Sequence, residues 1–179
     1  MGEIWVVRHG ETEWAAAGRH TGRTDVPLTE AGEEQARGLT FRLNRDWEAV
    51  LSSPLQRALR TAELAGFSPV IDDDLVEWDY GAAEGRTTAE LSVDAPWSPW
   101  DQPLGETVTQ LGGRVRRVLQ RLPKDGDVLV FGHGHCLRVL TAVYLGLPPI
   151  AGRHLRLDAA RVGVLGHEHE WPALKAWNL

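Results

Sequence analysis

The stretch Ile4-Trp5-Val6-Val7-Arg8-His9-Gly10-Glu11-Thr12 places an arginine and a histidine directly after a short apolar run. A second apolar run, Val128-Leu129-Val130-Phe131-Gly132, leads in the same way to His133. Both runs have the length of buried strands, and open α/β sheets bind ligands at the carboxyl ends of their strands. An arginine beside a histidine at such an edge suits an anionic substrate that an imidazole attacks. The pattern therefore favours phosphoryl chemistry with a histidine nucleophile.

Strand-like and helix-like segments alternate along the chain. We expect strands at 3–8, 49–52, 69–71 and 127–131, and helices at 29–44 (with Thr29 as N-cap), 55–65, 108–122 and 136–145. Two final strands, at 154–157 and 162–165, are expected to be antiparallel because little chain separates them. Without repeats or linkers, this alternation predicts a single domain, residues 1–179, of α/β class: a three-layer α/β/α sandwich around a mostly parallel central sheet.

The composition is that of an ordinary globular enzyme, with 42% apolar and 25% charged residues. A net charge of −6 provides no electrostatic footprint for nucleic acid or an anionic membrane, so an anionic substrate has to be attracted locally by a few arginines. No signal peptide or membrane span is apparent, and the single Cys136 cannot form an internal disulfide. We therefore expect a cytoplasmic protein with no nucleic-acid or membrane partner.

The first motif extends well beyond Arg8-His9-Gly10, and other short motifs follow it in a fixed order. They are Gly18-Arg19-His20-Thr21-Gly22, then Ser52-Ser53-Pro54 with Arg57-Ala58 and Thr61-Ala62, then Glu77 with Tyr80-Gly81 and Glu84-Gly85, then Gly105-Glu106-Thr107, then Gly132-His133-Gly134-His135. This set resembles the histidine phosphatase superfamily, which has the phosphoglycerate mutase-like fold, from residue 4 to about residue 145. The Gly-Arg-His-Thr-Gly segment is most similar to small sugar-phosphate phosphatases related to sedoheptulose bisphosphatase.

His9 is the expected nucleophile. Phosphoryl transfer needs an in-line nucleophile, cationic donors around the equatorial oxygens, and a proton for the leaving oxygen. A neutral imidazole can attack phosphorus and leave a phosphoramidate that water hydrolyses, which divides one difficult step into two. The resemblance assigns the same role to His9.

The remaining phosphoryl contacts are expected from two arginines and the second histidine. Arg8 and Arg57 are expected to clamp the phosphoryl group through forked hydrogen bonds. His133 is expected to donate to a phosphoryl oxygen, while Gly134 permits close approach of the backbone. His135 is expected to cap the following helix or to pack locally.

Glu77 is the expected proton donor. Spacing alone cannot select it, because several acids crowd the same stretch: Asp72, Asp73, Asp74, Asp79 and Glu84. The resemblance selects Glu77, which stands ahead of Tyr80-Gly81, and it leaves a structural role to Glu84. Thr21 and Gly22 match phosphate-contacting positions of the family, and Trp78 and Tyr80 are expected to line the cleft.

The chain departs from the family pattern at one position. Members often carry Asn directly after the Trp of the first motif, where it helps to hold phosphate, but Ala15 follows Trp14 here. The missing donor would lower phosphate affinity unless Thr21 or a backbone amide compensates. The set Arg8, His9, Arg57, Glu77 and His133 is intact, so loss of activity is not implied.

The residues favour hydrolysis of small phosphorylated metabolites, with two alternatives left open. A cofactor-dependent phosphoglycerate mutase would use the same phosphohistidine, but in the family it has a longer insertion beyond the proton donor than the stretch between Gly85 and Gly105 provides. A non-catalytic phospho-ligand binding protein is the other alternative, although no catalytic residue is missing.

No metal and no cofactor is expected. Imidazoles are common zinc ligands, and His133, His135, His167 and His169 could in principle form a zinc site. The pattern disfavours it, because His167 and His169 lie in a charged segment that is typical of a solvated face. The irregular segment 92–106, with Trp97 and Trp100, is expected to set substrate choice. A homodimer is open, because the eight tryptophans could include an interface.

Overall fold

The computed structural model describes residues 2–179 and contains a six-stranded sheet in the order β3-β2-β4-β1-β5-β6. The strands are β1 (Ile4–Arg8), β2 (Ala49–Ser52), β3 (Val70–Ile71), β4 (Val128–Gly132), β5 (Val162–Glu168) and β6 (Trp171–Ala176). The first four run parallel, whereas β5 is antiparallel to β1 and to β6. The predicted α/β class with a mostly parallel sheet is confirmed.

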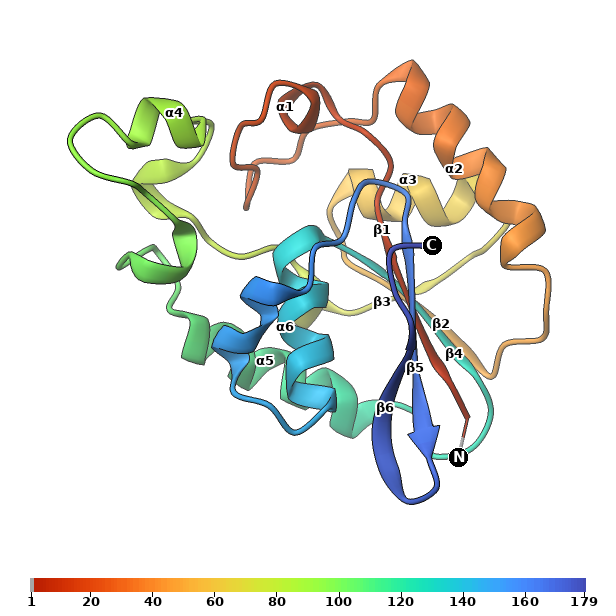
Figure 1. Ribbon diagram of the computed structural model, residues 1–179. Coiled ribbons are helices and arrows are strands. Elements are labelled where there is room, and N and C mark those ends of the chain that lie inside the picture. The colour runs from red at the N-terminus through yellow and green to blue at the C-terminus, as the bar shows by residue number, and fades with distance from the viewer. Residues whose placement is uncertain (1) are drawn as a thin grey trace.

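Two pairs of helices cover the two faces of the sheet (Figure 1). One pair is α2 (Glu30–Arg42) and α3 (Gln56–Leu64), and the other is α5 (Val108–Arg121) and α6 (Gly134–Tyr144). Successive side chains of a strand point to opposite faces, so Val7, Leu129 and Phe131 join the core under α2 and α3. Val6 and Val130 join the core under α5 and α6.

The helix boundaries follow from local capping chemistry. The Thr29 hydroxyl accepts from the Gly32 amide at 3.0 Å, as predicted for an N-cap. Thr107 and Gln110 form a reciprocal capping box at the start of α5. Gly66, with a φ of 96°, follows the end of α3. Each end of the four long helices lies within two residues of its expected bound.

The C-terminal region corrects two expectations. The strand expected at 154–157 is wrong: the segment Pro149–His154 forms the 3₁₀ helix η4, which begins directly after Pro148. The strand expected to end at Leu165 runs further, while the charged residues Glu168, His169 and Glu170 are exposed, as expected for a solvated segment. Strand β5 continues to Glu168, the turn places His169 at a φ of 53°, and β6 returns along β5. The antiparallel strand expected at 162–165 is confirmed.

The short elements around the carboxyl edge of the sheet were not predicted. They are α1 (Glu13–Ala16), α4 (Thr88–Leu91) and the 3₁₀ helices η1 (Asp73–Leu75), η2 (Gly81–Ala83) and η3 (Pro99–Asp101). Each is too short to show a helical period. Across residues 2–179, none of the helices combines the length and the apolar character that crossing a membrane requires.

Candidate active site

The two histidine motifs meet because β1 and β4 are adjacent and parallel. Arg8 pairs with Gly132, and the His9 amide donates to the Gly132 carbonyl at 3.0 Å. The His9 and His133 rings therefore lie edge to face with their centroids 5.2 Å apart. The expectation that both strand ends deliver a histidine to one edge is thus met.

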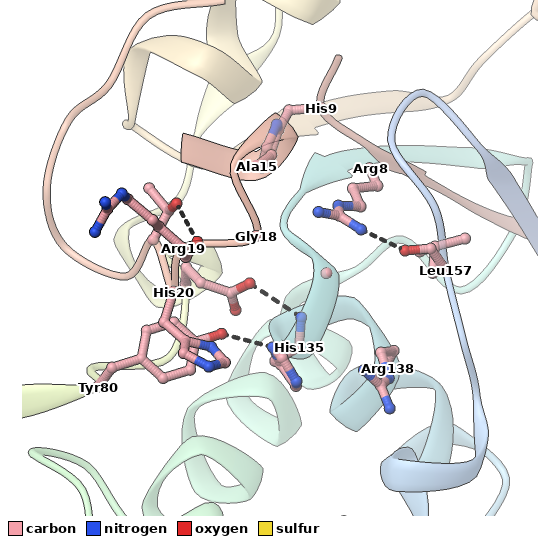
Figure 2. A pocket seen from close by; sticks show the side chains of 13 residues that line it. Arg8, His9, Ala15, Gly18, Arg19, His20, Tyr80, His135, Arg138 and Leu157 are labelled. Atoms are coloured by element: carbon pink, nitrogen blue, oxygen red, sulfur yellow. Dashed lines mark hydrogen bonds between the residues drawn. The ribbon is translucent and has the colours of Figure 1, made fainter. Parts of the chain in front are cut away.

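A pocket at this edge is lined by six of the nine predicted site residues. These six are Arg8, His9, Thr21, Glu77, Tyr80 and Gly134. Figure 2 shows their arrangement with Ala15, Gly18, Arg19, His20, His135, Arg138 and Leu157. The departure at Ala15 therefore lies in the pocket wall itself.

The His9 ring is oriented for attack by Nε2. Its Nδ1 lies 2.7 Å from the Gly10 carbonyl oxygen, which can only accept, so Nδ1 carries the proton and Nε2 carries the lone pair. Burial and the positive charges of Arg57 and Arg8 hold the pKa of His9 well below its ordinary value. The ring is therefore a neutral imidazole at physiological pH.

Arg8 offers an unpaired donor. Its Nη1 donates to the Leu157 carbonyl at 2.7 Å, whereas its Nε is buried and has no partner among residues 2–179 (Figure 2). A Cβ at position 134 would lie 3.4 Å from the Arg8 guanidinium carbon, which is ordinary van der Waals contact, so the Arg8 side chain packs closely over Gly134. A buried donor without a partner costs about 1–3 kcal/mol, a penalty that a bound anion would remove.

Arg57 lies behind the pocket wall. It is fully buried, and burial lowers the pKa of its guanidinium. It donates through Nη1 to the Thr24 carbonyl at 2.9 Å and through Nη2 to the Thr21 and Gly22 carbonyls at 3.2 and 2.8 Å. Its Nε donates to His133 at 3.2 Å. The expected clamp is therefore not preformed, and Arg57 would have to exchange these contacts for phosphoryl oxygens.

His133 is also buried behind the wall, between two polar partners. Its Nδ1 receives the Arg57 Nε–H, and its Nε2 lies 2.7 Å from the Ser53 hydroxyl. Burial and the Arg57 charge hold the pKa of His133 well below its ordinary value. Because Arg57 can only donate, the ring proton is on Nε2 in this arrangement. Sequence reasoning did not identify Ser53 as the partner of His133.

Glu77 enters the pocket from the segment after η1. Its Oε1 accepts from the Trp78 and Cys136 amides, both at 2.8 Å, and its Oε2 accepts from the His135 amide at 3.0 Å. Two of these donors belong to the first turn of α6, whose positive dipole end favours a carboxylate.

The rival acids have other contacts. Asp72 and Asp74 accept hydrogen bonds from exposed arginines, and Asp79 accepts a hydrogen bond from the Gly81 amide. Glu84 accepts from the Gly22 and Thr24 amides at 2.9 and 3.0 Å, which is the structural role expected for it. These contacts also show that Gly22, predicted to bind substrate, has its amide turned to Glu84 and does not line the pocket.

An aromatic wall completes the pocket. The Tyr80 hydroxyl lies 2.6 Å from His135 Nδ1, and burial raises the pKa of Tyr80 well above its ordinary value, so the phenol keeps its proton. The His20 ring lies 5.1 Å from that of Tyr80 and 4.8 Å from that of Trp97, centroid to centroid. Trp97 belongs to the segment 92–106, which therefore packs against a residue of the pocket wall.

Sequence reasoning missed His20 and Arg138 as pocket residues. Arg138 stands four residues after Gly134, on the same face of α6, and its guanidinium lies 4.9 Å from the Trp100 ring centroid. A helix predicted to begin at residue 134 instead of residue 136 would have placed Arg138 beside the pocket. His20 belongs to the Gly18-Arg19-His20-Thr21-Gly22 motif, but nothing in the sequence marks it as a pocket residue.

The four-histidine zinc site cannot form. His133 and His135 follow the end of β4, whereas His167 lies near the end of β5, which runs antiparallel to β1 and so ends at the opposite edge of the sheet. His167 contacts Tyr144 there, at 3.3 Å. Within residues 2–179, no cluster of three or more His, Cys, Asp or Glu side chains could hold a metal ion.

The model of the histidine phosphatase superfamily (branch 1) matches residues 4–179. The chain belongs to this superfamily. The match extends past residue 145, where the visible resemblance ends, and includes the β5–β6 hairpin.

Relatives of this histidine phosphatase carry both phosphatase and mutase names. It is 38% identical to an acid phosphatase of Mycobacterium tuberculosis, over 93% of this chain and 87% of that protein. It is 35% identical to the sedoheptulose 1,7-bisphosphatase of Saccharomyces cerevisiae, over 79% of this chain and 67% of that protein. It is 34% identical to the probable phosphoglycerate mutase GpmB of Erwinia tasmaniensis, over 99% of this chain and 90% of that protein.

The fold is shared with solved structures. The structure of the open reading frame Rv3214 of Mycobacterium tuberculosis superimposes with a TM-score of 0.92 at 36% identity, covering 99% of this chain and 97% of that one.

Proposed function

We propose that this histidine phosphatase hydrolyses phosphomonoesters of small metabolites, sugar phosphates or similar compounds, through a phosphohistidine on His9 with Glu77 as proton donor. One observation carries the proposal: His9, a neutral imidazole with its lone pair on Nε2, lines a single pocket together with Glu77 and with Arg8, whose buried Nε–H is unpaired. These are the nucleophile, the anion donor and the acid that the reaction needs. The phosphatase names of two relatives support the same reaction class.

In the first step, His9 Nε2 bonds to phosphorus while the bond from phosphorus to the leaving oxygen breaks. Glu77, a carboxylate in the free site that takes up a proton when the anionic ester binds beside it, gives that proton to the leaving oxygen. The imidazole gains positive charge, which the Gly10 carbonyl facing Nδ1–H stabilises. In the second step, water attacks phosphorus, the Glu77 carboxylate takes a proton from that water, and the N–P bond breaks to release phosphate.

Arg57 and His133 change partners when phosphate binds in this proposal. Arg57 Nε turns from His133 to a phosphoryl oxygen, and the Ser53 hydroxyl then donates to His133 Nε2. The Leu55 amide, 3.3 Å from the Ser53 oxygen, leaves the hydroxyl proton free for this. The ring proton of His133 moves to Nδ1, where it can be donated to a phosphoryl oxygen.

Labelled phosphate should be trapped on His9. With 4-nitrophenyl [³²P]phosphate, a rapid alkaline quench should recover a protein label that is stable in base and lost in acid, as a phosphoramidate is. His9→Ala should abolish both label and turnover, because it removes the proposed nucleophile. Label on any other residue of the parent protein would refute the nucleophile.

The proton donor and the phosphoryl clamp should respond differently to the leaving group. Glu77→Gln should slow glycerol 2-phosphate hydrolysis by about 10²–10⁴-fold, since a poor leaving group depends on general acid catalysis. It should slow 4-nitrophenyl phosphate hydrolysis far less. Arg57→Ala should slow both alike, because the equatorial oxygens are common to both esters. Equal losses in Glu77→Gln would remove Glu77 from the acid role.

Activity should not depend on a metal ion. Arg8, Arg57 and His133 are proposed to supply the charge stabilisation that Mg²⁺ gives elsewhere. Millimolar EDTA, followed by gel filtration, should leave phosphate release from 4-nitrophenyl phosphate within about twofold of the untreated protein. A larger loss that Mg²⁺ or Zn²⁺ restores would contradict this part of the proposal.

Hydrolysis should prevail over mutase activity. Trp97 and Trp100 of the segment 92–106 pack against His20 and His135 of the pocket wall, and in this proposal so short a segment leaves the phosphohistidine open to water. Incubation with 3-phosphoglycerate should yield phosphate and glycerate, or no reaction, with little 2-phosphoglycerate. Efficient interconversion stimulated by the 2,3-bisphosphate would establish the mutase alternative and leave the roles of His9 and Glu77 standing.

A further inference from the structure

The motif Gly105-Glu106-Thr107 has no part in the proposed mechanism, and Glu106 does not line the pocket. Its carboxylate instead pairs with Arg114 of α5 through two parallel contacts. Arg114 Nε lies 2.7 Å from one carboxylate oxygen, and Nη2 lies 2.8 Å from the other. The two side chains are only 7% and 12% exposed, so the pair is shielded from solvent screening.

The other donors of Arg114 bind the backbone that carries the proton donor. Nη1 donates to the carbonyls of Asp74 and Val76 at 2.7 and 2.6 Å, and Nη2 donates to the carbonyl of Glu77 itself at 3.0 Å. All five N–H groups of the guanidinium are thus used. The segment from 74 to 77 belongs to no strand, so Arg114 supplies the hydrogen bonds that a neighbouring strand would otherwise provide.

Glu106 holds the chain on the other side of Glu77. Its amide donates to the Asp79 carbonyl at 3.1 Å, and its carbonyl accepts from the Trp78 indole at 2.7 Å. A Cβ at position 105 would lie 2.4 Å from an Asp79 carboxylate oxygen, so a larger residue than Gly105 would displace the Asp79 side chain. The backbone is therefore fixed both before and after Glu77.

We propose that Arg114 and Glu106 are positioning residues for the proton donor, an inference that rests on the proposed role of Glu77. The Glu77 carboxylate meets the α6 amides at 2.8–3.0 Å only while its own backbone stays in place. A displacement of about 1 Å can cost on the order of 10²-fold in rate. Glu106 neutralises the guanidinium, which would otherwise be a buried charge satisfied by carbonyls alone.

A role exercised through Glu77 predicts a particular pattern of rate losses. The losses should be large where the leaving group needs a proton and small where it does not. They should also disappear when Glu77 can no longer act as an acid. A purely structural role would lower both kinds of turnover together and would add to the loss caused by a Glu77 substitution.

The experiment compares Arg114→Lys in the parent and in Glu77→Gln, with glycerol 2-phosphate and 4-nitrophenyl phosphate as substrates. Arg114→Lys keeps the charge but loses the fork, and should lower kcat for the alkyl ester by about 10²-fold and for the aryl ester by less than about tenfold. In the Glu77→Gln background it should change alkyl turnover by less than about threefold. Arg116→Lys, an exposed position of the same helix, is the matched control and should change neither.

Equal losses on both esters, or a full additional loss in the double variant, would overturn the proposal. If Arg114→Lys does not fold, as judged by circular dichroism, the near-isosteric Glu106→Gln decides by the same two criteria. Labelling of His9 by 4-nitrophenyl phosphate separates the two hypotheses. If His9 is labelled in the parent and the losses in kcat do not depend on the leaving group, only the positioning role is refuted. If His9 is not labelled in the parent, the proposed function is refuted.

Discussion

The parallel pairing of β1 with β4 is the constraint on which the rest of the site depends. Its register places Arg8 beside Gly132, the last residues of the two strands, so the histidine that follows each strand lies beside the other. A slip of one residue would turn every side chain of a strand to the opposite face. Val6 and Val7 are fully buried in different cores, and so are Val130 and Phe131. Packing on both faces therefore holds the register, and the register holds the two histidines together.

The electrostatics of the pocket follow from this arrangement. Arg8 and Arg57 lie close to two buried imidazoles, and burial together with the arginine charges keeps both rings neutral. A neutral ring is what a nucleophile requires, whereas the unpaired Nε of Arg8 is a cost in the free protein. The Glu77 carboxylate in the pocket accepts hydrogen bonds from two amides of α6. The site is thus arranged for an anion, at some expense in stability.

Much of the architecture could be predicted from apolar runs, capping residues and turn residues. The strand at 49–52, the N-cap at Thr29 and the helix over 108–122 needed only local chemistry, and all are close to what the structure contains. The failures lie where partners matter more than pattern. The expected strand at 154–157 yields to the 3₁₀ helix after Pro148, and β6 becomes a strand because β5 offers it an antiparallel edge.

The sequence by itself indicated the candidates for chemistry here: a histidine after each central strand, arginines near them, and an acid that the family resemblance places at the proton-donor position. Only the tertiary structure decided how their donors are used. It turned four donors of Arg57 away from the pocket, gave His133 the partner Ser53, and brought His20 and Arg138 to the wall. The reason is physical. A local sequence pattern encodes the length of a helix or strand, the face that it buries and the residues that cap it. The partner of a side-chain hydrogen bond depends instead on which groups folding brings within about 3 Å.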